Sequence, residues 1–445
     1  MKRSTFILCL IPAILLSCTK DMPQNKPVLS LSPRQDSNKI FSVSEADLLN
    51  YIEHYSPRTK AADISIKPYV FEDDTVLFEV TIGNTYKIFS SDKRLPPVYA
   101  YADINENSKI SITQNPELYS WVDADASAIK YFKKNNPDYR NERYEKEWAR
   151  IESGYTPPAN TKAEGDPREG DPGYWRWVST DTVDISNTVV GHLITTHWHQ
   201  NSPYNACCPK TSYYETTKCV AGCVAISGSQ TLFHLYKLYG VPSTLPSNVG
   251  CDGWYTGPNQ DHNTYGFHYD VRTATQWTNI QNGNQQSIAE LIGWLGYRLD
   301  MDYSPDDSTA HTSDLVAIFQ SEGITSTYTS YAAMTAFNYV FVRNRPVIIS
   351  SAYGSGRHSY ILDRAKKTDY TVRALYEYVP YGNNGVSTGE TMYETDHLYE
   401  YYVSMNFGWN DTSDNIYFSV NYWNSEGISI SSDSRYMLYN FGVIN

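Results

Sequence analysis

The chain has 445 residues, which is too long for one ordinary domain and leads us to expect two or three. Apolar residues make up 41% of the sequence, so sizeable hydrophobic cores can form. Acidic residues outnumber basic ones, 49 to 36, and the formal net charge of −13 argues against nucleic acid as a partner.

The first residues predict export. Lys2 and Arg3 precede an apolar run from Phe6 to Leu16, which is too short to span a membrane as a stable helix. The run ends at Cys18 and resembles a lipoprotein signal, with a plain cleaved signal peptide as the alternative. We therefore expect a signal peptide over residues 1–18, lipidation at Cys18 and an exported protein held at the bacterial cell envelope or surface by its lipid. Residues 19–40 are polar and contain prolines, which predicts a tether.

Residues 41–152 are predicted to form a small α+β domain. Ser44 and Asp47 precede an apolar helical pattern and predict a capped helix. Gly83-Asn84 predicts a hairpin turn. Hydrophobic patterns predict the strands Ile64–Phe71, Thr75–Ile82, Tyr86–Ser90 and Pro97–Ala102, and the helices Leu118–Lys134 and Asn141–Ile151.

Residues 153–173 contain prolines, glycines and charged residues but almost no apolar ones, which predicts an exposed linker. Exposed linkers with Lys and Arg are preferred sites of proteolytic cleavage. This segment is therefore a candidate maturation linker, with an ordinary spacer as the alternative.

A large aromatic-rich domain is predicted from residue 174 to residue 445. Its front half has helical patterns and its back half has strand patterns, and this order favours an α+β fold over a repeated βαβ unit. The expected helices are Cys223–Tyr239, Ser287–Leu299 with a capping box of Ser287 and Glu290, and Ser313–Glu322. The expected strands are Tyr339–Val342, Pro346–Ser350, Ser359–Leu362, Tyr401–Phe407, Ile416–Phe418 and Tyr436–Val443.

Cys223 is the candidate nucleophile. Gly222 interrupts the chain just before it, so the thiol lies at the start of a helix, where free N–H groups and the helix dipole favour an anion. A thiol in that place loses its proton more easily, and the thiolate is the reactive form. A buried core cysteine is the alternative.

The cysteine count leaves one thiol free. Outside Cys9 and Cys18 there are five cysteines, an odd number, and we expect Cys223 to stay unpaired in an oxidising compartment. The pairing of the other four stays open; they are Cys207, Cys208, Cys219 and Cys251.

A base and a group to orient it follow later in the chain. His358 comes after a Gly-rich turn at the start of a predicted strand, and Asn406 ends another strand among aromatic residues. His358 follows Cys223 by 135 residues, and Asn406 follows His358 by 48. This order and separation match papain-like cysteine peptidases. A buried strand histidine and a turn asparagine are the alternative interpretations.

Six short sequences carry a family resemblance. They occur in order within residues 198–420 and are Gln200–Asn205, Gly222–Ala225 with Gln230, Ile288–Leu291, Asp300–Pro305, His358–Asp363 and Asn406–Trp409. Through them the large domain resembles the streptopain family of papain-like bacterial cysteine peptidases. The segment Ile88–Asp103 resembles the inhibitory propeptide of that family.

The resemblance implies an α+β peptidase domain with a helical half and an antiparallel-sheet half, preceded by an inhibitory α+β propeptide domain. It implies Cys223 as nucleophile, His358 as general base and acid, and Gln200 as a donor to the oxyanion. Asn406 and Trp409 would support His358.

Substrate contacts are also implied. Thr309 and Ala310 would line the substrate groove, and Arg357 would border the cleft where the family commonly has glycine. We thus expect an exported zymogen of a cysteine endopeptidase that acts on proteins or peptides, with its own prodomain as inhibitor and without metal or cofactor.

Three other functions remain open. A zinc site could use His/Cys ligands, although their spacing matches no regular motif; these residues are His192, His197, His199, Cys207 and Cys208. A non-catalytic surface binding protein could retain a peptidase fold. An amine acyltransferase of transglutaminase type would use similar catalytic groups.

Overall fold

The computed structural model describes residues 41–55, 64–103, 110–113, 115–149, 173–246, 250–257, 264–268, 272–273, 276–353, 356–380, 384–408, 416–420 and 435–444. The expected signal peptide and tether, with Cys18, lie outside these residues. So do Trp409 and almost all of the expected linker. The domain boundaries therefore stay predictions.

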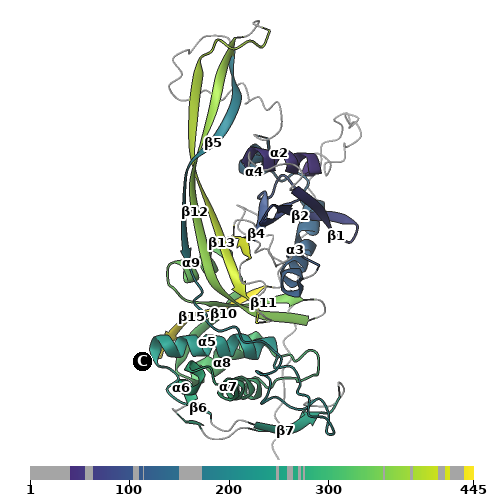
Figure 1. The fold of residues 1–445 in the computed structure, drawn as a ribbon, viewed down its shortest axis with the longest axis vertical. Coiled ribbons are helices and arrows are strands. Elements are labelled where there is room, and N and C mark those ends of the chain that lie inside the picture. Colours follow the sequence, from purple (N-terminus) through teal and green to yellow (C-terminus); the bar gives the residue numbers. More distant parts are fainter. Residues whose placement is uncertain are drawn as a thin grey trace, which may run out of the picture. The chain divides into compact units, whose positions relative to one another are not determined.

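One antiparallel sheet of 11 strands organises the described residues (Figure 1). Its order is β1-β2-β3-β4-β14-β13-β12-β11-β15-β10, and β5 also pairs with β12. The strands are β1 (Ile64–Phe71), β2 (Asp74–Ile82), β3 (Thr85–Ser90), β4 (Val98–Asp103), β5 (Gly173–Val190), β10 (Ile324–Ser330), β11 (Val347–Tyr353), β12 (Gly356–Pro380), β13 (Thr391–Asn406), β14 (Tyr417–Ser419) and β15 (Tyr436–Val443). Two small sheets pair β6 (Leu245–Pro246) with β9 (Arg272–Thr273), and β7 (Gly250–Tyr255) with β8 (Thr264–His268).

Helices precede most of the back-half strands, as expected. They are α2 (Glu45–Tyr55), α3 (Pro116–Asn135), α4 (Glu142–Ala149), α5 (Cys223–Tyr239), α6 (Gln276–Gln281), α7 (Gln285–Arg298), α8 (Leu315–Ser321) and α9 (Ala333–Phe341), with a 3-10 turn at Thr312–Asp314. Within the described ranges, none of these helices is long and apolar enough to cross a membrane. The α+β fold class, with a helical half and an antiparallel-sheet half, is confirmed.

Local sequence signals explain several element boundaries. The Ser44 hydroxyl accepts from the Asp47 amide at 3.2 Å, and Asp47 accepts from the Ser44 amide at 2.7 Å, which is the expected cap of α2. The expected helix from Cys223 to Tyr239 is confirmed with the same bounds. It ends at Gly240, whose φ of 70° is left-handed and suits glycine.

Two local predictions were wrong. The expected strand Tyr339–Val342 belongs instead to α9, because buried apolar residues recur with helical spacing at Ala333, Ala336, Phe337 and Val340. The cap of α7 is Asn284, whose side chain accepts from the Ser287 amide at 2.9 Å, and not Ser287 itself.

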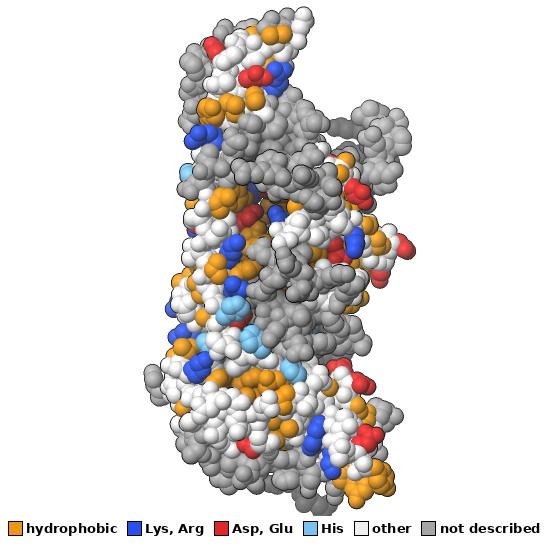
Figure 2. Space-filling model, in the orientation of Figure 1, with side chains coloured by type: hydrophobic (Ala, Val, Ile, Leu, Met, Phe, Trp, Pro, Cys, Tyr) orange, Lys and Arg blue, Asp and Glu red, His pale blue; other side chains and the backbone are white. Residues whose placement is uncertain are grey.

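A long ribbon of β5, β12 and β13 was also not expected in full. β5 was missed, and only the ends of β12 and β13 were predicted. Side chains on this ribbon are a mixture of hydrophobic and charged types (Figure 2). Ile185 and Tyr393 are 60% and 59% exposed. Where apolar residues are exposed, the hydrophobic pattern no longer reports which face of a strand is buried.

The strands near the centre of the sheet are buried on both faces. In β11 and β12, the side chains of Ile349, Tyr360 and Leu362 join one core, and those of Ile348 and Ile361 join the other. The first core also contains β1–β4, α3 and α9, whereas the second contains α5, α7 and α8. Successive residues of one strand therefore alternate between two sides. One side faces the predicted α+β domain of residues 41–152, here called the front domain, and the other faces helices α5, α7 and α8.

The front domain and the sheet share a buried ion pair. Arg435 lies 2.6 Å from Asp125 of α3, and both side chains are 0% exposed. The Arg435 guanidinium lies 3.8 Å from the ring centre of Trp121, and the Tyr99 hydroxyl donates to Asp125 at 2.6 Å. The pairing of β14 with β4 continues the sheet across the same boundary.

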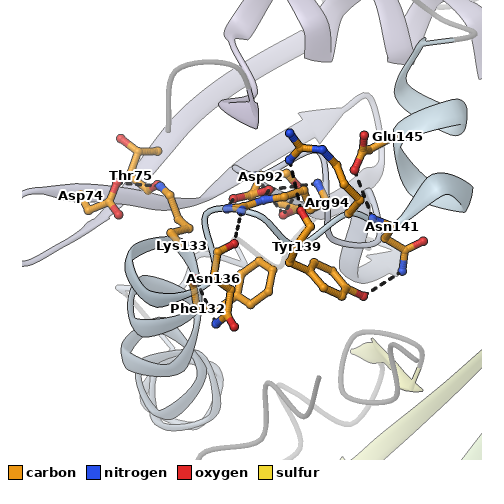
Figure 3. A network of polar contacts seen from close by, with 12 residues as sticks. Asp74, Thr75, Asp92, Arg94, Phe132, Lys133, Asn136, Tyr139, Asn141 and Glu145 are labelled. Atoms are coloured by element: carbon orange, nitrogen blue, oxygen red, sulfur yellow. Dashed lines mark hydrogen bonds and ion pairs between the residues drawn. The ribbon is translucent and has the colours of Figure 1, made fainter. Parts of the chain in front are cut away.

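A second buried arginine orders the front domain itself (Figure 3). Arg94 donates from Nε and Nη2 to the two oxygens of Asp92, at 2.9 and 2.6 Å. Its Nη1 donates to the Asn136 carbonyl at 2.6 Å, at the end of α3. Arg94, which lies inside the segment Ile88–Asp103 that resembles a propeptide, thus connects the loop after β3 to the C-terminus of α3.

Candidate active site

Cys223 is the first residue of α5, as the sequence predicts. Gly222 precedes it with a φ of 83°, which favours glycine. A Cβ at residue 222 would lie 2.8 Å from Met301 Sδ and 3.0 Å from the Ser308 carbonyl oxygen. Backbone conformation and space therefore both require glycine immediately before the thiol.

The thiol lies against the strand that carries His358. The Ser359 amide donates to Cys223 Sγ at 3.3 Å, and Sγ lies 4.0 Å from the Arg357 carbonyl oxygen. Burial raises the pKa of Cys223 to about 11, although the Ser359 amide lowers it, and the charge of Asp307 raises it further. The thiol is therefore protonated at neutral pH in this full-length chain.

His358 is buried at the start of β12. Its Nε2 lies 3.3 Å from the carbonyl oxygen of Phe407. Because a carbonyl only accepts, this contact assigns the proton to Nε2 and leaves Nδ1 as the basic nitrogen. Burial lowers the pKa of His358 to about 4, with the Phe407 contact opposing the shift. Both groups are thus neutral here, and the charged Cys–His pair stays a prediction for the processed enzyme.

Asn406 lies directly behind this carbonyl, at the end of β13. Its Oδ1 accepts from the Gly408 amide at 3.1 Å, and its Nδ2 donates to the Thr196 carbonyl at 2.8 Å. These bonds fix the turn that presents the Phe407 carbonyl to His358. Asn406 therefore stabilises the turn whose Phe407 carbonyl contacts the imidazole.

Gln230 contacts the segments that flank the site, and no role was predicted for it from the sequence. Its Oε1 accepts from the Thr196 hydroxyl at 2.8 Å and the Trp198 amide at 3.2 Å. Its Nε2 lies 3.5 Å from Asn406 Oδ1. Gln230 follows Cys223 by seven residues, so the two share a face of α5, and a buried polar residue at that spacing is the signal that could have identified it.

A cleft of about 320 Å³ brings the main predicted residues together. Gln200, Cys223, Arg357 and His358 all line it, with Asp306 and Asp307. A second cavity of about 50 Å³ shares Arg357 and His358 and includes Ala310. Thr309 lines neither; its amide and carbonyl pair with Asp302.

The zinc alternative receives no support from geometry. Across the described part of the chain, no three His, Cys, Asp or Glu side chains are grouped so that they could hold a metal ion. Cys207, Cys208 and Cys219 are buried, and burial raises the pKa of Cys208 far above its usual range.

A thiol at a helix start, an imidazole on the facing strand and an amide in one cleft define the class of cysteine-nucleophile proteins. Comparison with known proteins shows which family this region resembles. Residues 198–417 match the model of the Peptidase C10 family, and this range includes Gln200, Cys223, His358 and Asn406. The resemblance to the streptopain family is thereby confirmed.

Individual relatives are distant. Streptopain of Streptococcus pyogenes serotype M28 is 24% identical over 239 residues, which are 47% of this chain and 56% of that protein. Streptopain from serotype M3 of the same species matches to the same extent. The chain thus spans only a little over half the length of the curated relatives that it matches.

Two solved structures are also similar. A prointerpain A fragment of Prevotella intermedia is 17% identical with a TM-score of 0.45, covering 84% of this chain and 98% of that one. Active interpain A cysteine protease of the same species is 20% identical with a TM-score of 0.34, covering 56% and 94%.

Proposed function

We propose that this chain is the exported precursor of a cysteine endopeptidase that hydrolyses proteins. The observation that supports this most strongly is the cleft in which Gln200, Cys223 and His358 meet, although 158 residues separate the first from the last. The match of this region to a peptidase family gives independent support.

The proposed reaction passes through a thioester. His358 takes the proton from Cys223 Sγ, and the sulfur attacks the scissile carbonyl carbon. Gln200 and the amides at the start of α5 stabilise the oxyanion, and losing one such donor typically costs about 3–4 kcal/mol. His358 then protonates the leaving amine. Water, deprotonated by His358, attacks the thioester and releases the acid product and the free thiol.

The front domain is proposed to inhibit the enzyme until it is removed. Trp121 of α3 packs edge-on against Tyr360, with ring centres 5.6 Å apart. Tyr360 follows His358 by two residues in β12, and their ring centres are 5.7 Å apart. The docked domain thus covers the strand face that carries the imidazole. We propose cleavage within residues 153–173 as the step that releases it.

Export is a proposal from the sequence alone. Residues 1–18 would direct secretion, and Cys18 would carry the lipid that attaches the protein to the cell envelope. Membrane contact would occur through that lipid only. Loss of the protein from the membrane fraction on Cys18→Ser would support this step, and unchanged fractionation would contradict it.

The experiment is a mass measurement of purified full-length protein and its Cys223→Ala variant after incubation with casein. We expect the wild type to cleave casein and to shorten itself within residues 153–173, and the variant to do neither. Cys207→Ala, which removes a buried thiol away from the cleft, is the matched control and should retain both activities.

Three outcomes would contradict the proposal. Self-processing by purified Cys223→Ala would exclude Cys223 as the nucleophile. A wild-type protein that neither cleaves casein nor reacts with a thiol-directed probe at Cys223 would indicate a binding protein. Products with the mass of an amine adduct would indicate acyl transfer in place of hydrolysis.

A further inference from the structure

Arg357 is a fixed cation between the two cavities. It lines both the cleft and the small cavity of about 50 Å³. Its Nε donates to the Ser350 hydroxyl at 3.0 Å, and its Nη2 donates to the Ser350 carbonyl at 2.9 Å. The guanidinium also lies 5.2 Å from the ring centre of Tyr436. A cation held by three contacts loses little conformational freedom when it binds an anion.

The small cavity is polar and carries one permanent charge. Hydroxyl-bearing residues from four elements line it together with Arg357 and His311; they are Thr312, Ser313, Tyr328, Ser350 and Ser359. Among the described residues that line either cavity, Arg357 is the only Lys or Arg.

Among the residues that the structure describes, no acidic side chain lines the small cavity. Asp306 and Asp307 line the larger cleft and not the small cavity. Asp314 accepts from the Ser313 hydroxyl at 3.3 Å but does not line the small cavity either. The small cavity therefore favours a negative group, whereas the cleft wall formed by the two aspartates does not.

We propose that the small cavity binds an acidic side chain of the substrate, so that the enzyme selects peptides with Glu or Asp close to the scissile bond. The inference rests on the proposed peptidase function, since the cavity shares His358 with the cleft. A planar guanidinium matches a carboxylate in geometry and charge, and the surrounding hydroxyls supply further donors. The small volume suits a carboxylate group and excludes a large aromatic ring.

The test is a set of peptides that differ only by Glu, Gln or Lys at each position around one cleavage site. The processed enzyme should cleave the Glu peptide with a kcat/KM about 10- to 100-fold above that of its Gln counterpart at one position. Arg357→Gln should abolish this ratio, and Arg357→Glu should reverse it in favour of Lys. The ratio compares the kcat/KM values of two peptides cleaved by the same variant. A general loss of activity caused by changing the residue next to His358 therefore cancels.

Arg343→Gln is the matched control, because Arg343 is an exposed arginine that lines neither cavity. It should keep the wild-type ratio. No Glu preference at any position, or a preference that survives in Arg357→Gln, would overturn the inference. If the wild type cleaves neither casein nor any of the peptides, the proposed function is contradicted, and this inference fails with it.

Discussion

The backbone amide of Ser359 donates a hydrogen bond to the sulfur of Cys223 at 3.3 Å. A second contact reinforces it, because the hydroxyls of Ser227 and Ser359 lie 2.8 Å apart. Helix α5 and strand β12 are thus joined by the residue that follows His358. The position of the thiol relative to the imidazole depends on this junction as well as on the two side chains themselves.

The first prediction concerns the reactivity of the thiol in the full-length chain. Burial raises the pKa of Cys223 to about 11, so the thiolate fraction should rise about tenfold for each pH unit between pH 6 and pH 9. Alkylation of Cys223 by iodoacetamide, followed by peptide mass spectrometry, should show this slope. A rate that is already high and flat from pH 5 to pH 8 would indicate a charged Cys–His pair before processing and contradict the prediction.

A second prediction concerns acid stability. Burial lowers the pKa of His358 to about 4, so below pH 6.5 the unfolded chain binds a proton that the folded chain does not. The contribution of this histidine to stability is therefore complete above pH 6.5 and is lost as the pH falls towards 4. Thermal melts of full-length Cys223→Ala should show a smaller decrease in Tm over this range when His358→Asn is added. Identical decreases with and without His358 would argue against a buried neutral imidazole.

The third prediction is that Gly228→Ala destabilises the protein. A Cβ at residue 228 would lie 2.6 Å from Leu295 Cδ2 in α7 and 2.8 Å from Leu315 Cδ2 in α8. Overpacking of this kind typically costs about 1–3 kcal/mol, against about 1 kcal/mol gained in helix propensity. We expect a lower free energy of unfolding in urea, and little change for Leu238→Ala, which removes an exposed side chain from the same helix. A more stable Gly228→Ala protein would mean that propensity outweighs packing.

The positions of Cys223 at a helix start and of His358 near a strand start could be predicted, because both follow glycine-marked boundaries that local rules describe. Cys223 follows a glycine with positive φ, and His358 lies near the start of β12, which begins at Gly356. The contacts of Asn406 and Gln230 were not predictable, because they join segments that only tertiary packing brings together. The ribbon was underestimated for a different reason: its exposed apolar residues obscure the alternation by which strands are recognised.

A fourth prediction assigns Gln230 a positioning role. Gln230→Ala should reduce kcat about 10- to 100-fold with little change in KM, because the turn at Asn406 loses a buried partner. Gln230→Glu places a carboxylate against Asn406 Oδ1, and only its protonated form can donate as the amide does. The activity of Gln230→Glu relative to wild type should therefore rise as the pH falls towards 5. If the activity of Gln230→Glu relative to wild type does not change with pH, Gln230 contributes only packing.

The fifth prediction concerns the ion pair between the front domain and the sheet. Asp125→Asn removes the carboxylate and leaves the fully buried Arg435 cation without its counter-charge, which typically costs about 3–5 kcal/mol. We expect urea denaturation of full-length Cys223→Ala to show this loss. Lys133→Gln is the matched control on the same helix, since its pair with Asp74 is partly exposed and should contribute less than about 1 kcal/mol. Replacing both partners, as Asp125→Leu with Arg435→Met, should restore much of the lost stability, because neither charge is then left buried. A double variant as unstable as Asp125→Asn would show that the cost arises from packing around Trp121 and not from the unpaired charge.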